Sequence, residues 1–512
     1  MTASTLTYAL GSLVLIGYTL CLIYILGYSI MQWDLLLLFL RKKHLLTAKQ
    51  RSQNTNNTHT ELPFVTVQLP IYNERHVVSR LIDAIAALDY PTDRFEIQVL
   101  DDSTDETTDI LRERIRHHRQ RGIDIQLIRR PTRTGYKAGA LQYGLQRAKG
   151  SYIAIFDADF IPQHDFLRQV IPHFQDPSTA VVQTRWAHLN EDHSLLTKLQ
   201  AFQLNNHFYV EQSGRYLGNL FLQFNGTAGV WRKKAILDAG GWQWDTLTED
   251  LDLSYRAQLK GWKIHYLPWV GTPAELPVEM NSFKAQQYRW IKGGAETARK
   301  ILPLLWHAPL PLRTKLHASF HLLSNFIFVI ILLAGILSIP MMFVWELFPM
   351  LKPLYSIFII SLLVVIAVYF VANVLHAWRH KPLHSSLMRF LWMFPTFLSL
   401  SMGMSVHNTI AVLRGIQRQS SPFIRTPKLN ISQTQPIKPS PYLRPSLPSS
   451  TYLEFLLAAL FTAGALLNAL RQDWSLLYFH GMLAMGFTAI ALYSWQHYRI
   501  IKRFHTKNIQ YA

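Results

Sequence analysis

Two carboxylates one residue apart, Asp157 and Asp159, follow a short apolar run at residues 152–156. At the end of a strand both side chains can reach one hard cation, and Mg²⁺ and Mn²⁺ prefer oxygen ligands. Such an ion also binds a diphosphate and neutralises the charge that develops as the diphosphate leaves. A polar boundary between strand and loop is the other interpretation, but two unpaired acids at one strand end repel each other. The pair therefore predicts a site for a divalent cofactor, Mg²⁺ or Mn²⁺.

Two further acidic clusters each admit two interpretations. Asp102, in the run DDSTD at residues 101–105, could accept hydrogen bonds from a base or a ribose, but its neighbours are also good helix N-caps. Asp250, next to Glu249 in the run TED, could be a general base that deprotonates an acceptor hydroxyl. Acids also favour the first turn of a helix. Taken alone, each cluster leaves both interpretations open.

Basic and aromatic residues supply groups that would bind a phosphorylated sugar. Arg289, in the run QQYRW at residues 286–290, can clamp a phosphate bidentately, and Trp290 can stack against a sugar ring. The same run fits an amphipathic helix at a membrane surface, and the two interpretations are compatible. Lys137, in GYKAGA at residues 135–140, opens a predicted helix and suits a diphosphate, although the spacing is not that of a Walker motif.

Alternating strand and helix patterns must position these residues. Strands are predicted at residues 64–69, 97–100, 123–128 and 152–156, and helices at residues 77–88, 105–121 and 138–148. Strands that alternate with helices predict a mostly parallel α/β sheet, in which ligands bind at the carboxyl ends of the strands. The run DDSTD and the pair of Asp157 and Asp159 both follow such ends, so we expect them at the ligand-binding edge of the sheet.

The composition indicates that part of the chain lies in a membrane. Of the 512 residues, 49% are hydrophobic and only 16% are charged, and long apolar runs flank a more polar region at residues 41–315. The net charge of +19 fits anionic lipid or an anionic substrate better than nucleic acid, because no nucleic-acid-binding motif accompanies it. Cys21 is the only cysteine, which excludes a disulfide framework or a thiolate metal site within one chain.

Five apolar runs approach or exceed the roughly 20 residues that a spanning helix needs. They are residues 6–30, 320–345, 354–378, 452–470 and 476–495. The Lys and Arg residues beside them predict that residues 41–315, the linker 414–445 and the C-terminus face the cytosol, with the N-terminus outside. An even number of crossings must then separate residues 315 and 414. The run at 388–404, which contains Arg and Pro, is therefore predicted to be re-entrant or interfacial.

The order of the motifs carries a resemblance to a known family. Besides the runs already described, the chain contains QLPIYNE, FDADF, VQTRW and NGTAGVWR. In this order the sequence resembles family 2 inverting glycosyltransferases, above all the cellulose-synthase-like branch that makes plant mannans and the xyloglucan backbone. The resemblance covers about residues 60–300 closely and the membrane helices loosely. It implies an α/β nucleotide-sugar transferase domain with the A-type glycosyltransferase fold, a mostly parallel mixed sheet, embedded in an α-helical transmembrane protein.

The resemblance also implies roles for individual residues. Nucleotide-sugar binding is implied for Tyr72, Glu74, Asp102, Lys137, Asp157 and Thr426. Metal binding is implied for Asp157 and Asp159, diphosphate or acceptor binding for Glu249, Gln286, Arg289 and Trp290, and base catalysis for Asp250. Thr426 belongs to SPFIRTPK at residues 421–428, which looks like the gating loop of the polymerising members of the family.

The implied function is transfer of sugar from UDP-glucose or GDP-mannose to a growing β-glucan or β-mannan, with inversion and coupled export. Transfer of one sugar to a lipid, as in ceramide glucosyltransferases, is the alternative. The complete set of acids together with Arg289 argues against a scaffold with an inactive transferase domain, and the large soluble insertion argues against a transporter. The expected partners are the nucleotide-sugar donor, a glycan acceptor and membrane lipid, with no nucleic acid; an export partner is possible.

These interpretations divide the chain into eight parts. They are a spanning helix (1–40), a linker (41–62), the transferase domain (63–280), interfacial amphipathic helices with QQYRW (281–315), spanning helices with the re-entrant segment (316–413), a gating-like loop (414–450), a transmembrane hairpin (451–497) and a cytosolic tail (498–512). We expect a multi-pass protein of a bacterial inner membrane with a cytosolic catalytic domain.

Overall fold

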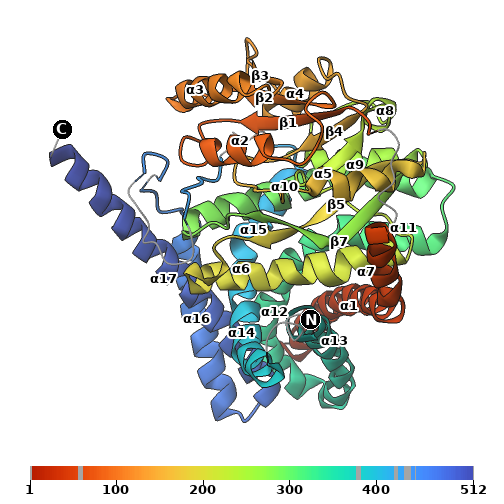
Figure 1. The fold of residues 1–512 in the computed structure, drawn as a ribbon. Helices are drawn as coiled ribbons and strands as arrows, with labels where there is room; N and C mark the ends of the chain where they lie inside the picture. The colour runs from red at the N-terminus through yellow and green to blue at the C-terminus, as the bar shows by residue number, and fades with distance from the viewer. Residues whose placement is uncertain are drawn as a thin grey trace.

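A computed structural model describes residues 3–55, 62–375, 382–419, 425–431, 440–443 and 445–510. A sheet with helices around it forms the upper part of the view in Figure 1, and a bundle of long helices forms the lower part. Helices α10 and α11 follow the last strand and lead from the sheet into the bundle. The two parts correspond to the polar and apolar regions that the sequence distinguishes.

The central sheet is mixed and mostly parallel, as the alternation of strands and helices predicts. Its seven strands are β1 (Val65–Ile71), β2 (Phe95–Asp101), β3 (Ile125–Ile128), β4 (Tyr152–Ile155), β5 (Thr179–His188), β6 (Gly229–Arg232) and β7 (Lys263–Ala274). They lie in the order β3-β2-β1-β4-β6-β5-β7. Strand β6 runs antiparallel to β4 and β5, whereas the other neighbouring pairs are parallel.

Helices cover both faces of the sheet, because successive side chains of each strand point to opposite faces. One face packs against α2 (Val78–Ala86), α3 (Thr107–Gln120) and α5 (Phe166–Val170), and the other against α4 (Tyr136–Leu145), α8 (Lys233–Asp238) and α9 (Glu249–Leu259). Ala154 of β4 belongs to the first core, and its neighbours Ile153 and Ile155 belong to the second. Burial on both faces makes the sheet a rigid base for the loops at its edges.

Four helices connect the sheet with the bundle or pack beside this connection. They are α6 (Leu195–Asn205), α7 (Gln212–Leu217), α10 (Met280–His307) and α11 (Leu312–Leu322). Glu279 caps α10 by accepting hydrogen bonds from the backbone N–H groups of Asn281 and Ser282. Lys284 of α10 then makes a 2.8 Å ion pair with Glu454 of α16 (Ser450–Leu470), and both side chains are buried. Such a buried pair holds α10 in one position on the bundle, because either charge alone would be costly to bury.

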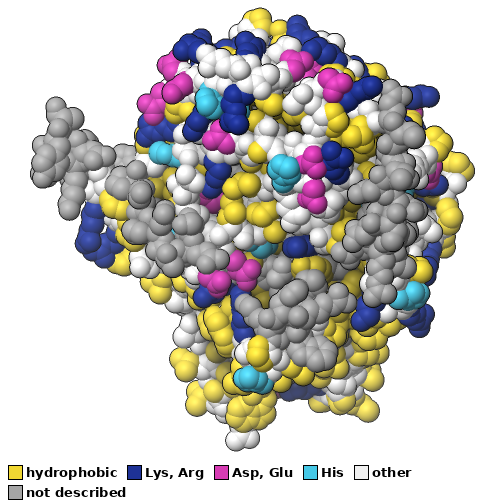
Figure 2. Space-filling view, in the orientation of Figure 1, with side chains coloured by type: hydrophobic (Ala, Val, Ile, Leu, Met, Phe, Trp, Pro, Cys, Tyr) yellow, Lys and Arg dark blue, Asp and Glu magenta, His cyan; other side chains and the backbone are white. Residues whose placement is uncertain are grey.

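Among the described residues, five helical segments are long and apolar enough to cross a membrane, which is the number expected. They are Thr5–Thr47, Ser324–Leu347, Pro349–Leu375, Ser450–Leu470 and Trp474–Phe504. Large hydrophobic side chains such as Leu13, Leu363 and Leu456 remain exposed on them. Figure 2 shows hydrophobic side chains gathered over the lower part of the molecule, below a more highly charged upper part. The protein is therefore a membrane protein whose bundle presents an apolar surface to lipid.

The apolar run at residues 388–404 lies in α14 (Leu383–Gly403), which continues after a bend of 47° into α15 (Ser405–Ile416). A helix pair bent in this way is a broken span or a re-entrant segment, so the prediction of a re-entrant or interfacial segment stays open. The prediction of a linker from residue 41 was wrong, because α1 (Ala3–Thr55) continues through most of that stretch. Residues 41–50 contain only Arg, Lys, His, Leu, Thr, Ala and Gln, with no Gly or Pro to end a helix.

Candidate active site

The residues predicted to bind a nucleotide-sugar follow the carboxyl ends of parallel strands. Tyr72 and Glu74 follow β1, Asp102 follows β2, and Asp157 and Asp159 follow β4. Because β1 pairs in parallel with both β2 and β4, the three strand ends lie side by side. The structure therefore brings these five residues to one edge of the sheet, where the sequence places them.

Lys137 connects the first predicted metal-binding carboxylate to the loop that faces Asp250. It lies in the first turn of α4, and its Nζ donates to Asp157 Oδ1 at 2.6 Å and to the carbonyl oxygen of Gly226 at 2.9 Å. Gly226 has a φ of 80°, and a Cβ built there would lie 2.9 Å from Asp250 Oδ2. Glycine at this position therefore allows the backbone to approach the Asp250 carboxylate closely.

Asp250 has the surroundings of a general base. Burial, together with repulsion from Glu249, raises the pKa of Asp250 to about 7, so this carboxyl can exchange a proton near neutral pH. Asp252, two positions further along α9, is fully buried and makes ion pairs of 2.8 Å with Arg256 and 2.9 Å with Lys300. The structure thus separates an acid that can accept a proton from one that ties helices together.

Arg289 of α10 lies among the carboxylates of the site. Its Nη2 donates to Thr426 Oγ1 at 2.9 Å, which joins the QQYRW run to the gating-like loop. Burial lowers the pKa of Arg289 to about 10, although the nearby carboxylates of Asp157 and Glu249 favour its charged form. Arg289 therefore stays cationic at neutral pH and is placed to balance the charge of a diphosphate.

Aromatic rings gather next to Arg289. The centroid of Trp290 lies 6.3 Å from that of Trp186 at the end of β5, and Phe160 lies 5.3 Å from Trp186. Among the described residues Nε1 of Trp186 is buried without a hydrogen-bond partner. Gln286 is half-buried on α10, and helical spacing places it on the same face as Arg289 and Trp290. Such a group offers stacking surface and a free N–H donor, which suit a sugar ring.

Asp102 has a cationic partner that the sequence did not reveal. Arg130 donates from Nε and Nη2 to the two carboxylate oxygens at 2.8 and 2.6 Å. Beside them, the guanidinium of Arg133 lies 3.3 Å from the centre of the Tyr72 ring. A base or ribose at this position would meet a stacked Tyr72–Arg133 pair and a carboxylate already bound to arginine.

The gating-like loop neutralises two other carboxylates of the site. Arg425 Nη1 lies 2.6 Å from Glu74 Oε2, and Lys428 Nζ donates to Asp159 Oδ2 at 2.7 Å. Burial raises the pKa of Glu74 to about 7, although Arg425 favours its ionised form. Residues 421–424 of the run SPFIRTPK lie outside the described residues. The part that is described contacts Glu74 and Asp159 after β1 and β4, and its Thr426 contacts Arg289.

Asp157 and Asp159 fit a divalent cation if a ligand completes the coordination. Each carboxylate already has a lysine ammonium at 2.6 or 2.7 Å, so each favours a cation. Across the described part of the chain, no group of three or more His, Cys, Asp or Glu residues is arranged to hold a metal ion. Mg²⁺ takes six oxygen ligands, and diphosphate oxygens are the usual supplement to one or two carboxylates.

Sequence reasoning assigned no role to Arg130, Arg133, Trp186, Glu275 or Lys428. Trp186 and Lys428 lie in the runs VQTRW and SPFIRTPK, so their motifs marked them without indicating what they contact. Arg130 and Arg133 follow the third strand in a basic stretch, which is a weak signal. No sequence signal identifies Glu275, because its importance depends on β7 ending beside the gating-like loop.

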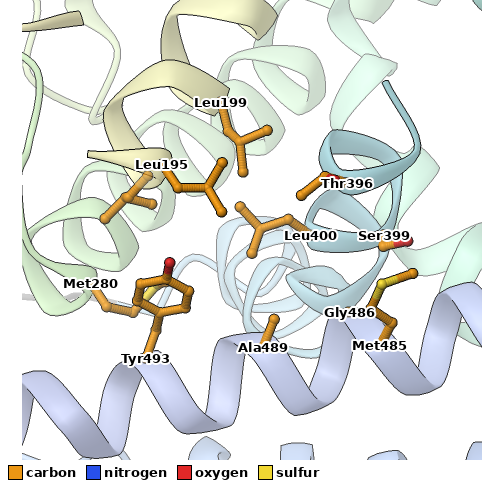
Figure 3. Close-up of a pocket in the computed structure, with 11 residues that line it drawn as sticks. Leu195, Leu199, Met280, Thr396, Ser399, Leu400, Met485, Gly486, Ala489 and Tyr493 are labelled. Atoms are coloured by element: carbon orange, nitrogen blue, oxygen red, sulfur yellow. The ribbon is translucent and has the colours of Figure 1, made fainter. Parts of the chain in front are cut away.

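A small apolar cavity of about 50 Å³ lies among α6, α14 and α17 (Trp474–Gln510). Figure 3 shows Leu199, Leu400 and Ala489 among the side chains around it. No charged residue lines this cavity, so it lacks the groups that bind a diphosphate. The candidate active site is the charged edge of the sheet, and the cavity is a gap in the packing of the bundle.

The chain is similar to known sugar transferases. Residues 63–293 match the family described as glycosyltransferase like family 2. A protein of Oryza sativa subsp. japonica described as a probable glucomannan 4-beta-mannosyltransferase is 38% identical over 387 residues, which are 73% of this chain and 67% of that protein. Glucomannan 4-beta-mannosyltransferase 2 of Arabidopsis thaliana is 46% identical over 248 residues, which are 48% of this chain and 46% of that protein.

Among solved structures, a mannosyltransferase from Pyrobaculum calidifontis in complex with GDP-Man and Mn²⁺ matches 76% of this chain and 100% of its own, with 17% identity and a TM-score of 0.45. Apart from the rice protein, the match spans about half the length of the plant relatives. These relatives are plant proteins named for transfer to glucomannan. They give no support to a bacterial membrane or to the ceramide-type alternative.

Proposed function

The chain belongs to family 2 of the glycosyltransferases, in the cellulose-synthase-like branch, and we propose that it transfers mannose from GDP-mannose to a growing β-linked mannan or glucomannan. The names of the plant relatives support mannose as the sugar and a glucomannan-type polymer as the product. The observation that carries the proposal is the position of Asp250, a half-buried acid with a pKa of about 7, across Gly226 and Lys137 from Asp157.

The geometry supports a single displacement at the anomeric carbon. Asp250 takes the proton of an acceptor hydroxyl as the hydroxyl oxygen forms its bond to that carbon. The bond to the diphosphate breaks on the opposite side, so an α-linked donor gives a β-linked product. Lys137 and Arg289 lie on the side of Asp157, where their positive charges balance the leaving diphosphate. Trp290 and Trp186 hold the acceptor sugar by stacking, which orients its hydroxyl toward Asp250.

Asp157 and Asp159 would hold a divalent cation, which when bound supplies electrostatic stabilisation of the leaving diphosphate. Both Mg²⁺ and Mn²⁺ accept carboxylate and phosphate oxygens. The nucleotide would lie against Tyr72 and Asp102, where Arg130 and Arg133 add positive charge. We propose that the transferase domain faces the cytosol and that the polymer leaves through the membrane bundle.

Transfer by the purified full-length protein in liposomes tests the proposal. Radiolabelled GDP-mannose and UDP-glucose are offered separately with Mg²⁺ or Mn²⁺, and the product is sized and digested with β-mannanase. We expect a long, mannanase-sensitive product from GDP-mannose. Incorporation from UDP-glucose alone would contradict the choice of sugar, and a short product that organic solvent extracts would contradict polymer synthesis.

A pair of aspartate variants controls this experiment. Asp250→Asn keeps the size of the side chain but removes the base, so incorporation should fall to background. Asp238→Asn changes an exposed aspartate at the end of α8, whose partners are Lys260 and Trp262, and should leave incorporation unchanged. Equal loss in both variants would indicate damage to the fold and would leave no support for Asp250 as the base.

A further inference from the structure

Residues 425–431, called the strap below, belong to no helix or strand and contact the residues that follow β1, β4 and β7. Lys428 Nζ lies 2.7 Å from Asp159 Oδ2, and Arg425 Nη1 lies 2.6 Å from Glu74 Oε2. All four side chains are largely buried. The strap therefore supplies the counter-charges of two carboxylates in the donor site.

Glu275, directly after β7, binds the backbone of the strap through hydrogen bonds. Its side chain is 3% exposed, and its two oxygens accept hydrogen bonds from consecutive backbone N–H groups, Leu429 N at 2.9 Å and Asn430 N at 3.1 Å. Asn430 has a φ of 55°, and a left-handed residue helps successive N–H groups to point toward one anion. Arg80 of α2 also donates to the Asn430 side chain at 2.5 Å. These contacts fix the backbone immediately after Lys428.

The Lys428 ammonium lies on Asp159, where a bound metal ion is expected. A buried carboxylate needs a cationic partner, and Asp159 has the Lys428 ammonium in contact with Oδ2. An ammonium and a divalent cation repel each other at such distances, so the two compete for that oxygen. We propose that Lys428 occupies the cation position on Asp159 until the donor and its metal arrive, and that Glu275 is the positioning residue that places Lys428 there. This inference rests on the proposed function in one respect, that Asp159 meets a divalent cation.

Binding of Mn²⁺ without any nucleotide or sugar tests the role of Lys428. The purified full-length protein is titrated with Mn²⁺, and free Mn²⁺ is measured by electron paramagnetic resonance. Lys428→Met should bind Mn²⁺ about tenfold more tightly than the unchanged protein, because Asp159 loses its competing cation. Lys428→Arg, which keeps the charge, should behave like the unchanged protein. So should Lys149→Met, which removes an exposed lysine whose partners are Asp124 and Glu96. Unchanged or weaker binding by Lys428→Met would overturn the proposal.

A double-mutant cycle tests Glu275 as a positioning residue. Glu275→Gln removes a nearby negative charge, which weakens Mn²⁺ binding by the same factor whether or not Lys428 is present. In the chain that keeps Lys428 it also frees the strap, so we expect the affinity to rise there and to fall or stay unchanged in Lys428→Met. An equal change in both backgrounds would overturn the positioning role. Because no donor is present, a wrong assignment of the sugar would leave these results unaffected. If the variants bind Mn²⁺ as expected but the unchanged protein transfers no mannose, that outcome would count against the proposed function alone.

Discussion

The charges next to each acid of the site affect how readily it accepts a proton. Asp252 has Arg256 and Lys300 as partners and forms part of the packing between α9 and α10. Asp250 is half-buried and has the Glu249 carboxylate beside it, so its ionised form is destabilised and its pKa rises to about 7. A carboxyl with this pKa is a far better proton acceptor at neutral pH than an ordinary aspartate.

The raised pKa of Asp250 predicts how the rate of transfer depends on pH. Only the ionised carboxylate accepts a proton, so below pH 7 the rate should fall toward a tenfold loss per pH unit, and above pH 7 it should level off. Asp250→Asn should lower the rate about a hundredfold or more at and above pH 7 and abolish this dependence. Initial rates at saturating donor measure both effects. A profile that stays flat on the acid side of neutrality would contradict the assignment of the base.

Helix α10 contacts both the candidate active site and the helix bundle. One of its faces presents Arg289 and Trp290 to the site, and Lys284 joins it to α16 through a buried ion pair. At Gly293 the helix lies so close to the residue before Glu249 and Asp250 that an added Cβ would lie 2.6 Å from Thr248 Cγ2 and 2.8 Å from Thr248 N. The position of Asp250 therefore depends on the packing of α10.

Gly293→Ala tests this dependence. The added methyl group must push Thr248 away from α10, which moves the adjacent Glu249 and Asp250, while alanine itself favours the helix. We expect the rate of transfer to fall about tenfold or more with little change in helix content, because small displacements of reacting groups are costly. The matched control is Gly481→Ala in α17, where an added Cβ meets nothing within 4 Å. Equal rates in the two variants would show that α10 does not position the acid.

At the scale of the whole molecule, two charged connections between apolar helices lie at the same end of the bundle. Lys352, between the second and third spans, makes a 2.8 Å ion pair with Asp473, in the turn between α16 and α17. Arg471 of the same turn pairs with Glu346 at 3.0 Å. These two connections therefore lie together at one end of the bundle, and the prediction of five crossings puts that end on the side opposite the transferase domain.

Thiol labelling tests the resulting orientation. With Cys21 replaced by Ser, single cysteines are introduced as Met350→Cys, at a position that is 89% exposed beside Lys352, and as Arg116→Cys on the exposed face of α3. A reagent that cannot cross the membrane should label Met350→Cys in intact cells and Arg116→Cys only after the cells are opened. The reverse pattern would place the transferase domain outside and would exclude cytosolic nucleotide-sugar as its donor.

Much of this architecture is visible in the sequence because it follows from local patterns. Alternating strands and helices predicted the mostly parallel sheet, and the fold expected from the resemblance is confirmed. The length of apolar runs predicted the five helical segments that are long and apolar enough to cross a membrane. The motifs placed Tyr72, Asp102 and Asp157 at strand ends, because strand ends are where parallel sheets present ligand-binding loops. The end of the first helix was missed, because polar residues are compatible with both a linker and an exposed helix.

The sequence by itself determined which residue types stand at the strand ends and which stretches enter the membrane. Only the tertiary structure decided which charge faces which. Lys428 meets Asp159 across 269 positions, and Arg130 rather than a neighbour in the motif binds Asp102. The physical reason is that ion pairs and pKa values change over a few ångströms, whereas spacing along the chain specifies only the strand or helix on which a residue lies. Asp250 and Asp252 share one helix, but the packing around α9 gives them different partners. Asp250 lies beside the Glu249 carboxylate and its pKa is raised, whereas Asp252 pairs with Arg256 and Lys300.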